Sequence, residues 1–567
     1  MRRTSALFLA ALLVCGITAQ APGREADEAP DHIGPRTEAV SPERYARVLH
    51  VSQTSGSDEI GDGSEQRPWK TIGQALAKVS ATANSSRAAL LVGAGAYGEP
   101  LQMRPNIDLY GGFDPSTWER DIIAHATVLD GQSARRVVVG ASDARIDGFV
   151  IRGGRVQAPG AGILCDRASP TITNNTITGN ATLEPAGYIH ALMHQVGNDG
   201  GGIACVNGAA PIIANNLISG NSTGVGGGGG IATSNYAAPI ILNNVLCDNL
   251  TGATDRNQSR SSNGAAISCV NLPMKVQAGD TSRKRIANNV ILNNRVSGRS
   301  DAGGIYCDYD ASPEIAGNFI LGNTAEDDGG AIYVMKSSEP AIRGNVIAGN
   351  TGGGAIRLSK EGRAWIENNL LFANSTGGVT CNRSWMTLKN NTIVNNTGNG
   401  MAYENDTRHL QPSVASSNIF FGNVDNKIRI QSKFSPPMAI THSLVQGGYK
   451  GEGNINADPQ FIDDGCVLPV AAVEFDEARY QTRLTLGEEI GPKLSGRVVR
   501  MGSRWGVVHE CGSKNLVVWG DLRGPGGAHG ARKFEILPTY RLSAGSPCIG
   551  AGRHGTNIGS DQRMRKN

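Results

Sequence analysis

Five residues suited to acid–base chemistry stand at matching places in neighbouring segments of the chain. Tyr306, Tyr333 and Arg357 each follow the isoleucine of a glycine-led segment, and Asp301 and Asp328 precede that isoleucine by four residues. A lyase acting on a uronic acid needs a cation to neutralise the carboxylate and a base, often Tyr, Lys or His. A hydrolase needs two carboxyls at a defined separation. These five residues are therefore the candidate catalytic group.

The same residue types have other uses. Stacked acids such as Asp301 and Asp328 can instead bind Ca²⁺ through their oxygens, which makes Ca²⁺ a candidate cofactor and leaves the metal site itself unknown. Asp is also a common turn residue before a strand, and Tyr is common on a solvated β face. All three interpretations stay open at this stage.

A second set of residues is suited to holding a sugar. Trp365 and Trp385 fall on outward positions of two successive segments, where an aromatic pair makes an apolar platform for a sugar ring. A neighbouring loop or the C-terminal part of the chain can equally well cover them, because large aromatic residues seldom stay exposed.

Basic and histidine residues in long intervening loops complete the candidate binding set. Residues 255–299 are rich in Lys and Arg, among them Lys275, Arg283 and Arg285, which suits a polyanionic glycan or an ordinary solvated loop. His190 and His194 are spaced i, i+4, so one face of a short helix would present both to a substrate or a metal ion. No third metal ligand is evident beside them.

The candidate site residues belong to a sequence repeat, and the fold of this repeat must position them. Nine times one asparagine precedes another by five residues, although the distance between successive pairs varies; the pairs are Asn175/Asn180, Asn216/Asn221, Asn244/Asn249, Asn289/Asn294, Asn318/Asn323, Asn345/Asn350, Asn369/Asn374, Asn391/Asn396 and Asn418/Asn423. A constant unit with variable loops is typical of a solenoid. Short β-branched strands bounded by Gly and Asn predict an all-β, right-handed parallel β-helix.

The asparagines are expected at tight corners. Asn tolerates left-handed backbone geometry and can bond its own turn, and stacked asparagines can bond one another along the axis. Equivalent positions in successive coils should lie about 4.8 Å apart, so nine coils make a rod of about 45 Å.

A column of cysteines accompanies the glycine-led strands. Cys165, Cys205, Cys269, Cys307 and Cys381 occupy the same place in five coils. Free cysteine packs as a small hydrophobe, which favours a buried column over a disulfide or metal ladder. Zinc spacing of the C-x-x-C type is absent from the sequence.

The ends of the chain differ from the repeat. Residues 1–19 have the pattern of a secretion signal and residues 20–45 that of a flexible linker, which predicts a secreted, extracellular or periplasmic protein. The solenoid is expected over 46–462 with a capping helix near 71–80, a small β subdomain over 463–538, and a tail over 539–567 that returns to the solenoid. Trp505 and Trp519 of that subdomain suit a core or a carbohydrate site. The formal charge of +3 gives no reason to expect nucleic acid, and no apolar run after the signal is long enough for a transmembrane segment.

The N-terminal motifs carry a family resemblance. Gly56-Ser57-Asp58 leads to Arg67-Pro68-Trp69-Lys70-Thr71-Ile72, and the tail contains Leu542-Ser543-Ala544-Gly545-Ser546-Pro547. Over about residues 48–462 the chain resembles secreted bacterial right-handed β-helix proteins of the pectate-lyase-like superfamily, with an N-terminal motif like that of the DUF1565 family. The resemblance implies polysaccharide lyases, glycoside hydrolases, epimerases or proteins without known chemistry. No catalytic or calcium-binding motif of a defined lyase family transfers residue by residue.

Two functional hypotheses follow. The first is a secreted carbohydrate-active β-helix, a lyase or hydrolase that acts on an acidic polysaccharide. The second is a non-enzymatic surface or matrix solenoid that binds glycans and resembles, at the level of repeats only, the passenger rods of adhesins. Polysaccharide is the expected partner in both.

Overall fold

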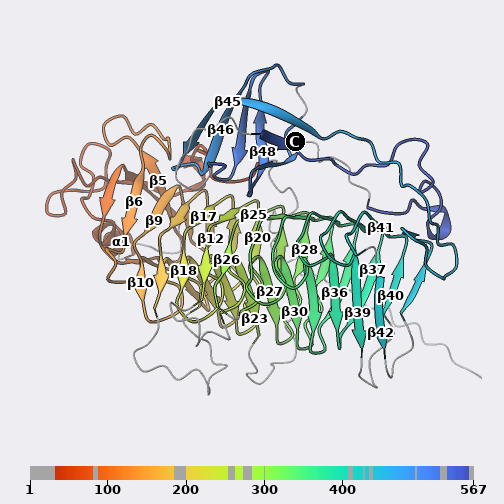
Figure 1. Cartoon of the computed structure of the whole chain (residues 1–567). Coiled ribbons are helices and arrows are strands. Elements are labelled where there is room, and N and C mark those ends of the chain that lie inside the picture. The colour runs from red at the N-terminus through yellow and green to blue at the C-terminus, as the bar shows by residue number, and fades with distance from the viewer. Residues whose placement is uncertain are drawn as a thin grey trace, which may run out of the picture.

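The chain folds into a long β-solenoid with a separate small barrel beside it (Figure 1). This computed structural model describes residues 32–80, 87–183, 199–252, 262–271, 284–298, 300–405, 413–425, 428–432, 438–491, 494–523 and 533–560. The predicted signal over 1–19 therefore lies outside the described residues.

Three long parallel sheets form the walls of the solenoid, and each coil contributes one short strand to each wall. Sheet A has 14 strands: β1 (Arg47–Val51), β2 (Ala88–Gly93), β5 (Ile107–Phe113), β8 (Arg145–Asp147), β12 (Thr171–Thr173), β16 (Ile212–Ala214), β20 (Ile240–Leu242), β24 (Arg285–Ala287), β28 (Glu314–Ala316), β31 (Ala341–Arg343), β34 (Arg363–Glu367), β37 (Trp385–Lys389), β40 (Val414–Ser416) and β43 (Ala439–Thr441).

Sheet B has 13 strands: β3 (Gly95–Tyr97), β6 (Thr127–Asp130), β9 (Phe149–Arg152), β13 (Thr176–Thr178), β17 (Leu217–Ser219), β21 (Val245–Cys247), β25 (Val290–Leu292), β29 (Phe319–Leu321), β32 (Val346–Ala348), β35 (Leu370–Phe372), β38 (Thr392–Val394), β41 (Ile419–Phe421) and β44 (Leu444–Val445). Sheet C has 12 strands: β4 (Leu101–Gln102), β7 (Val138–Val139), β11 (Ile163–Asp166), β15 (Ile203–Val206), β19 (Ile231–Ser234), β23 (Ile267–Val270), β27 (Ile305–Asp308), β30 (Ile332–Met335), β33 (Ile356–Ser359), β36 (Val379–Asn382), β39 (Met401–Asn405) and β42 (Ile428–Ser432).

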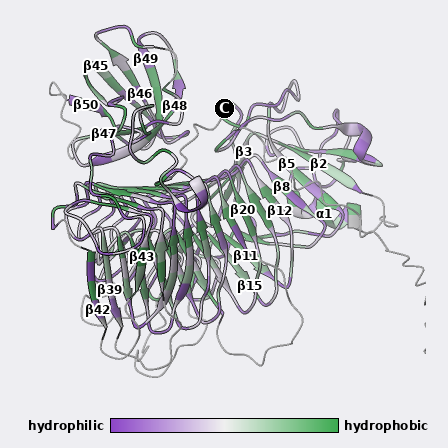
Figure 2. Cartoon of the chain, turned by 90° about the vertical axis from the view of Figure 1, so that its right-hand side faces the viewer, coloured by the Kyte–Doolittle hydropathy of each residue, from purple (hydrophilic) through white to green (hydrophobic). Residues whose placement is uncertain are grey.

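A fourth, short sheet D joins five early coils through β10 (Arg155–Val156), β14 (Ala181–Thr182), β18 (Ser222–Thr223), β22 (Leu250–Thr251) and β26 (Arg295–Val296). The predicted right-handed parallel β-helix is confirmed. Its strands alternate, so that one set of side chains fills the lumen: Ile172, Ile213 and Ile241 lie in register and are buried. Figure 2 shows hydrophobic residues on many of these strands, β12, β15 and β20 among them.

Two asparagine ladders run along the solenoid. One lies where the sheet B strands begin, and the other lies where they end. In the first, Nδ2 of Asn175 donates to Oδ1 of Asn216 at 3.1 Å, and Nδ2 of Asn216 donates to Oδ1 of Asn244 at 3.0 Å. In the second, Asn180 donates in the same way to Asn221 at 3.0 Å. Each carbonyl oxygen also accepts the backbone N–H of the preceding coil's asparagine, as Asn216 Oδ1 does from Asn175 N at 2.9 Å. The ladders thus satisfy corner groups that the solenoid buries.

The prediction that the paired asparagines adopt left-handed geometry themselves is wrong. The residue before each one has the positive φ instead: Asn174, Asn215, Asn243, Asn288, Gly317, Gly344, Asn368, Asn390 and Ser417 precede the first ladder, and Gly179, Gly220, Asp248, Asn293, Gly322, Gly349, Ala373, Asn395 and Gly422 precede the second. The corner therefore divides two tasks between two residues. One turns the chain, and the asparagine that follows bonds along the axis.

The N-terminal motif builds the cap of the solenoid. Asp58 accepts hydrogen bonds from the backbone N–H groups of Lys70 and Thr71 at 2.9 and 3.0 Å, and Thr71 Oγ1 donates to its other oxygen at 2.8 Å. Glu99 accepts the N–H groups of Ile72 and Gly73, the first residues of helix α1 (Ile72–Ser80). These carboxylates satisfy free N–H groups at the helix start, and the helix covers the open end of the lumen (Figure 1).

Residues 32–45 do not form the predicted flexible linker. We call this segment, which includes the short helix η1 (Pro42–Arg44), the strap. Gly34 N donates to Asn243 O at 2.8 Å, and Arg36 N donates to Asn174 Oδ1 at 3.4 Å. The strap therefore lies along the solenoid, held by bonds to corners that are distant in sequence.

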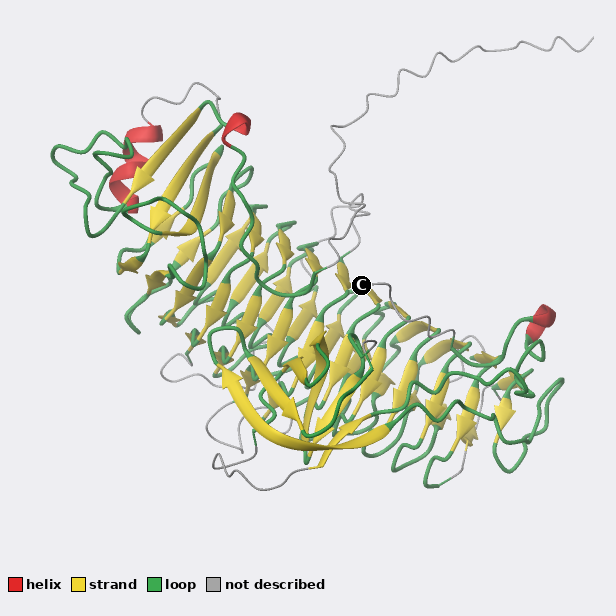
Figure 3. Cartoon of the chain, turned by 90° about the horizontal axis from the view of Figure 1, so that it is seen from above, coloured by secondary structure: helices red, strands yellow, loops and turns green. Residues whose placement is uncertain are grey.

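The C-terminal part forms a closed antiparallel barrel of six strands: β45 (Cys466–Asp476), β46 (Gln481–Leu486), β47 (Val498–Met501), β48 (Arg504–Cys511), β49 (Asn515–Trp519) and β50 (Lys533–Ile536). It packs on the outer face of sheet B, crossing above the rod in Figure 3. Trp505 and Trp519 are buried there, which confirms their core role. The approach is so close that a Cβ on Gly349 would lie 2.0 Å from the Trp505 ring.

The tail returns to the same face of sheet B. Cys548 and Ile558 are buried against it, and the tail includes the short helix η3 (Arg553–Gly555). Barrel and tail together cover sheet B from β17 onward, whereas sheet A keeps exposed side chains such as Trp365 and Val414.

The described cysteines are all free thiols, and the column over Cys165, Cys205, Cys269, Cys307 and Cys381 is buried as predicted. We expect a thiol reagent such as dithionitrobenzoate to react first with exposed Cys466 and more slowly with half-buried Cys511. The buried thiols should react only after unfolding in guanidinium, because the reagent cannot reach them in the folded protein. Burial also raises the pKa of Cys548 to about 11. Fast reaction of the column in the folded protein would contradict this packing.

Candidate functional site

The five predicted catalytic residues lie together on the outer side of sheet C. In the register of β27, β30 and β33, Tyr306 pairs with Tyr333 and Tyr333 with Arg357. The rings of the two tyrosines are 5.9 Å apart. Asp301 and Asp328 lie at the turns that begin β27 and β30, and Arg357 Nε is 2.9 Å from Asp328 Oδ2. The alignment of coils made from the sequence therefore places these residues correctly.

Neither tyrosine lies on the solvated β face that the sequence left open for them. Tyr306 is 5% exposed and Tyr333 is 3% exposed, and both pack with Ala302 and Met335 in an apolar cluster outside the lumen. Their hydroxyls are also occupied. The Tyr306 hydroxyl donates to Asp308 Oδ2 at 2.9 Å, and the Tyr333 hydroxyl is 2.6 Å from Ser359 Oγ.

This environment makes either tyrosine a poor base. Burial, together with the charges of nearby acids, raises the pKa of Tyr306 well above its usual value and that of Tyr333 to about 12. A general base works best when its pKa is near the operating pH. The geometry therefore gives less support to a tyrosine-based lyase than the sequence did.

The acids at the turns have a structural task. Asp199 Oδ1 accepts the N–H of Gly227 at 2.7 Å, Asn263 Oδ1 accepts that of Asp301 at 2.8 Å, and Asp301 Oδ1 accepts that of Asp328 at 3.2 Å. These side chains form a third, less regular ladder. The turn interpretation of the aspartates is thus correct for their backbone bonds.

The same acids have perturbed protonation. Burial, with the negative charges of Asp328 and Asp327, raises the pKa of Asp301 from 3.8 to about 7. Burial also raises the pKa of Asp328, and the neighbouring Arg357 opposes that rise. Carboxyl groups in unlike environments are the arrangement that divides acid and base roles in many active sites.

Sheet A carries the predicted aromatic platform. Trp365 of β34 is 40% exposed, and its ring lies 5.4 Å from that of Trp385 of β37 in a T-shaped arrangement. Trp365 Nε1 donates to Glu339 Oε1 at 3.0 Å, and Arg363 lies 3.9 Å from the same carboxylate. The barrel does not cover this pair, since it lies on sheet B.

Only part of the predicted basic stretch lies among the described residues. Lys275, Arg283, His190 and His194 lie outside the described residues. Arg285 is half-buried and pairs with Glu314 at 3.6 Å. Lys284, which the sequence had counted with the exposed cations, is buried; its Nζ donates to Asn271 Oδ1 at 2.9 Å, and burial lowers its pKa.

The sequence interpretation missed a pocket at the N-terminal end of sheet A. It is lined by strap residues together with Asp108 and Tyr110 of β5 and Arg145 and Asp147 of β8. A signal was present, because an acid directly follows a core isoleucine at Ile107-Asp108 and at Ile146-Asp147. An acid within such a strand indicates a buried partner.

Within the described ranges, no cluster of three or more His, Cys, Asp or Glu is placed to hold a metal ion. Binding of Ca²⁺ stays a prediction. None of the helices seen in the described part has the length and apolar character needed to cross a membrane.

Comparison with known proteins bears on the fold. Residues 276–437 match the family described as right handed beta helix region. The chain is a right-handed parallel β-helix protein. Residues 54–329 of this β-helix protein also match a protein family of unknown function (DUF1565), which agrees with the resemblance drawn from the N-terminal motif. No curated protein matches the sequence significantly.

Solved structures with similar architecture share little sequence with this β-helix protein. Pectate lyase Pel9A is 12% identical, with a TM-score of 0.35 and coverage of 91% of this chain and 96% of its own. XylC in complex with xylose is 12% identical, with a TM-score of 0.34 and coverage of 88% and 98%. A lacto-N-biosidase from Eubacterium ramulus is 10% identical, with a TM-score of 0.25 and coverage of 70% and 68%. These likenesses concern architecture alone.

Proposed function

We propose that this protein is a secreted glycan-binding β-helix that holds sugar rings on the Trp365/Trp385 platform. One observation carries the proposal: exposed Trp365 and half-buried Trp385 lie side by side on a sheet face that the described parts of the barrel and tail do not cover. Soluble proteins seldom leave such aromatic area open without a ligand.

The surroundings of the platform suit a carbohydrate. The indole faces offer apolar contact, and Glu339 and Arg363 beside them offer an acceptor and donors for hydroxyl groups. The bond from Trp365 Nε1 to Glu339 also fixes one ring, which lowers the entropy lost on binding. Acids and bases alternate on this face through pairs such as Arg343 and Glu367, so the platform itself favours no sign of charge.

Binding to a panel of acidic and neutral polysaccharides tests the proposal, read from tryptophan fluorescence and from a glycan array. Trp365→Ala should weaken binding about 30-fold, because truncation of an aromatic anchor costs about 2 kcal/mol. Trp365→Phe should recover part of the loss. Ile60→Ala, which removes an exposed apolar side chain elsewhere on the surface, serves as the control and should change nothing.

The proposal fails if no glycan in the panel binds, or if binding survives Trp365→Ala and Trp385→Ala unchanged. A preference for uronic-acid polymers would favour the acidic polysaccharide expected from the sequence. Equal binding of neutral polysaccharides would contradict the expected preference for acidic ones and would still support glycan binding on the platform.

A second candidate function is glycoside hydrolysis through the acids of sheet C. The observation that favours it is the pKa of Asp301, which is raised to about 7 beside a carboxylate paired with Arg357. A carboxyl of this kind can remain protonated near neutral pH and act as a general acid. Release of reducing ends from a bound glycan, lost in Asp301→Asn, would favour this function.

A further inference from the structure

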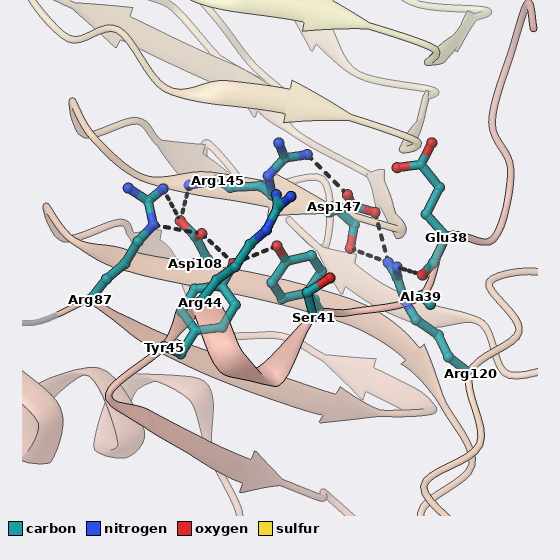
Figure 4. A pocket seen from close by; sticks show the side chains of 11 residues that line it. Glu38, Ala39, Ser41, Arg44, Tyr45, Arg87, Asp108, Arg120, Arg145 and Asp147 are labelled. Atoms are coloured by element: carbon teal, nitrogen blue, oxygen red, sulfur yellow. Dashed lines mark hydrogen bonds and ion pairs between the residues drawn. The ribbon is translucent and has the colours of Figure 1, made fainter. Parts of the chain in front are cut away.

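The cavity at the N-terminal end of sheet A is a distinct site, separate from the platform and from the sheet C column. It measures about 220 Å³ and lies between the strap and strands β5 and β8 (Figure 4). Pockets for drug-sized ligands are about 300–1,000 Å³, so this one fits a smaller molecule. Its floor consists of two carboxylates, Asp108 and Asp147, each 1% exposed.

The acceptor capacity of Asp108 is already used. Arg87 donates to it in bidentate fashion, with Nε to Oδ2 at 3.0 Å and Nη2 to Oδ1 at 2.8 Å. The Tyr45 hydroxyl donates to Oδ2 at 2.7 Å, and the backbone N–H of Arg145 donates to Oδ1 at 2.9 Å. Four donors thus fill the lone-pair sites of one carboxylate.

Asp147 is occupied as well. Arg120 Nη2 donates to Oδ1 at 2.7 Å, and Arg145 Nη1 lies 3.3 Å from Oδ2. Asn174 Nδ2 approaches both oxygens at 3.4 Å. Arg120 is itself tied down by the carbonyl groups of Gly111 and Glu38. The floor of the pocket therefore presents no free acceptor of its own.

What remains in the pocket is an excess of donors. Arg44 of the strap is exposed and forms no ion pair within the part of the chain that is described, and Figure 4 shows Arg44 and Arg145 both reaching over the cavity. Arg145 uses one of its guanidinium nitrogens on Asp147 and keeps a side chain that is 31% exposed. Ser41 adds a hydroxyl. The remaining acid, Glu38, accepts from Arg36 Nε at 2.7 Å.

We propose that this pocket binds the anionic group of a small acidic sugar, through Arg44 and Arg145. Donors in excess, rigid supporting carboxylates and a volume below that of a drug-sized pocket suit a small anion. An acidic sugar is the small anion that fits the glycan-binding function proposed above. Arginine forks match planar carboxylates and tetrahedral sulfates alike, so the shared feature is a negatively charged oxygen group. The strap supplies part of the site. Its position along the solenoid is therefore needed for binding.

Calorimetric titration of the full chain tests this site with galacturonate, galactose 6-sulfate and neutral galactose. Galacturonate or galactose 6-sulfate should bind. The sugar that binds more tightly shows whether the pocket prefers a carboxylate or a sulfate. Galactose should bind at least tenfold more weakly than that sugar. Arg44→Gln should weaken the binding of the anionic sugar tenfold or more, because a charge-assisted bond is lost.

Arg44 suits this experiment because it is exposed and removal of its charge leaves the buried pairs intact. Arg104→Gln, which removes an exposed arginine from the turn before β5 and outside the pocket, is the matched control and should bind as the unmodified protein does. The inference is overturned if neither anionic sugar binds, if galactose binds as well as they do, or if Arg44→Gln has no effect. Trp365→Ala should leave this binding unchanged, which separates it from the platform.

Discussion

Asn318→Ala is expected to lower the free energy of unfolding by about 4 kcal/mol, a large effect for the loss of one amide. Its Oδ1 accepts from Asn289 N and from Asn289 Nδ2, both at 2.9 Å, and its Nδ2 donates to Ile286 O and to Asn345 Oδ1, both at 2.9 Å. Asn289 Nδ2 and Asn345 Oδ1 keep other partners. The Asn289 N–H loses its partner inside the wall, and the Ile286 carbonyl loses the bond that the Asn318 amide donates.

The size of this effect follows from burial. The buried Asn289 N–H left without a partner costs about 1–3 kcal/mol, and the loss of the other bonds of the Asn318 amide adds to that. Urea unfolding followed by far-ultraviolet circular dichroism measures the change, which should appear as an earlier midpoint. The control is Asn382→Ala, which removes one half-buried amide whose Nδ2 bonds Glu404 at 3.1 Å on the outer face. Its expected cost is below about 1 kcal/mol.

The ladder account is contradicted if Asn318→Ala costs no more than Asn382→Ala. In that case the carbonyls and N–H groups at the corners would have to find partners among themselves. Replacement by Asp should not restore stability, because a charge at this buried position lacks a counterion and no longer offers the Nδ2 donor to Ile286.

The sequence was most informative where one offset repeats. The five-residue spacing of the asparagines set the length of each sheet B strand, and the recurring isoleucine of the glycine-led segments set the register of Tyr306, Tyr333 and Arg357 without any structure. Within a solenoid, residues far apart in the chain become neighbours by counting alone. The lumen residues and both ladders were predictable for the same reason.

Contacts that do not recur from coil to coil could not be predicted from the repeat. Alternation gave the outward direction of Tyr306 and Tyr333, yet it carries no information on what packs over them, and both are buried. Lys284 is part of a basic stretch in the sequence, but its side chain is buried in the structure. The strap had the composition of a linker, and only its bonds to Asn174 and Asn243 hold it in place.

The N-terminal pocket depends on the same kind of long-range contact. Tyr45 meets Asp108 across 63 positions of the chain, and Arg120 meets Asp147 across 27. Each acid stands out in its own strand, but the partner that neutralises it cannot be read from a local pattern. Such ion pairs, and segments such as the strap that cover them, can be assigned only once the three-dimensional structure is known.

Asp301→Asn is expected to stabilise the protein at alkaline pH and to change it little in acid. The native pKa of Asp301, about 7, lies above the ordinary value of 3.8 because burial and the charges of Asp328 and Asp327 disfavour its ionised form. The folded state therefore binds this proton more tightly than the unfolded state does. Its contribution to stability is complete below about pH 3.8 and is lost as the pH rises through 7.

Asparagine keeps the oxygen that accepts the Asp328 N–H and cannot ionise. The variant should be more stable than the unmodified protein by up to about 4 kcal/mol at pH 8, and by less than about 1 kcal/mol at pH 4. Urea unfolding at the two pH values measures the difference. Asp310→Asn, at an exposed turn of the same coil, should stay within about 0.5 kcal/mol at both.

The same variant separates the two candidate functions, because it gains stability whichever is correct. If Asp301 is a general acid, Asp301→Asn binds glycan on the platform but releases no reducing ends, and its loss of turnover cannot be blamed on unfolding. If the protein only binds glycans, Asp301→Asn and the unmodified chain should behave alike on every glycan. A variant that is less stable at pH 8 would show that the Asp301 carboxylate is held by a favourable contact, and the acid role would then lose its physical basis.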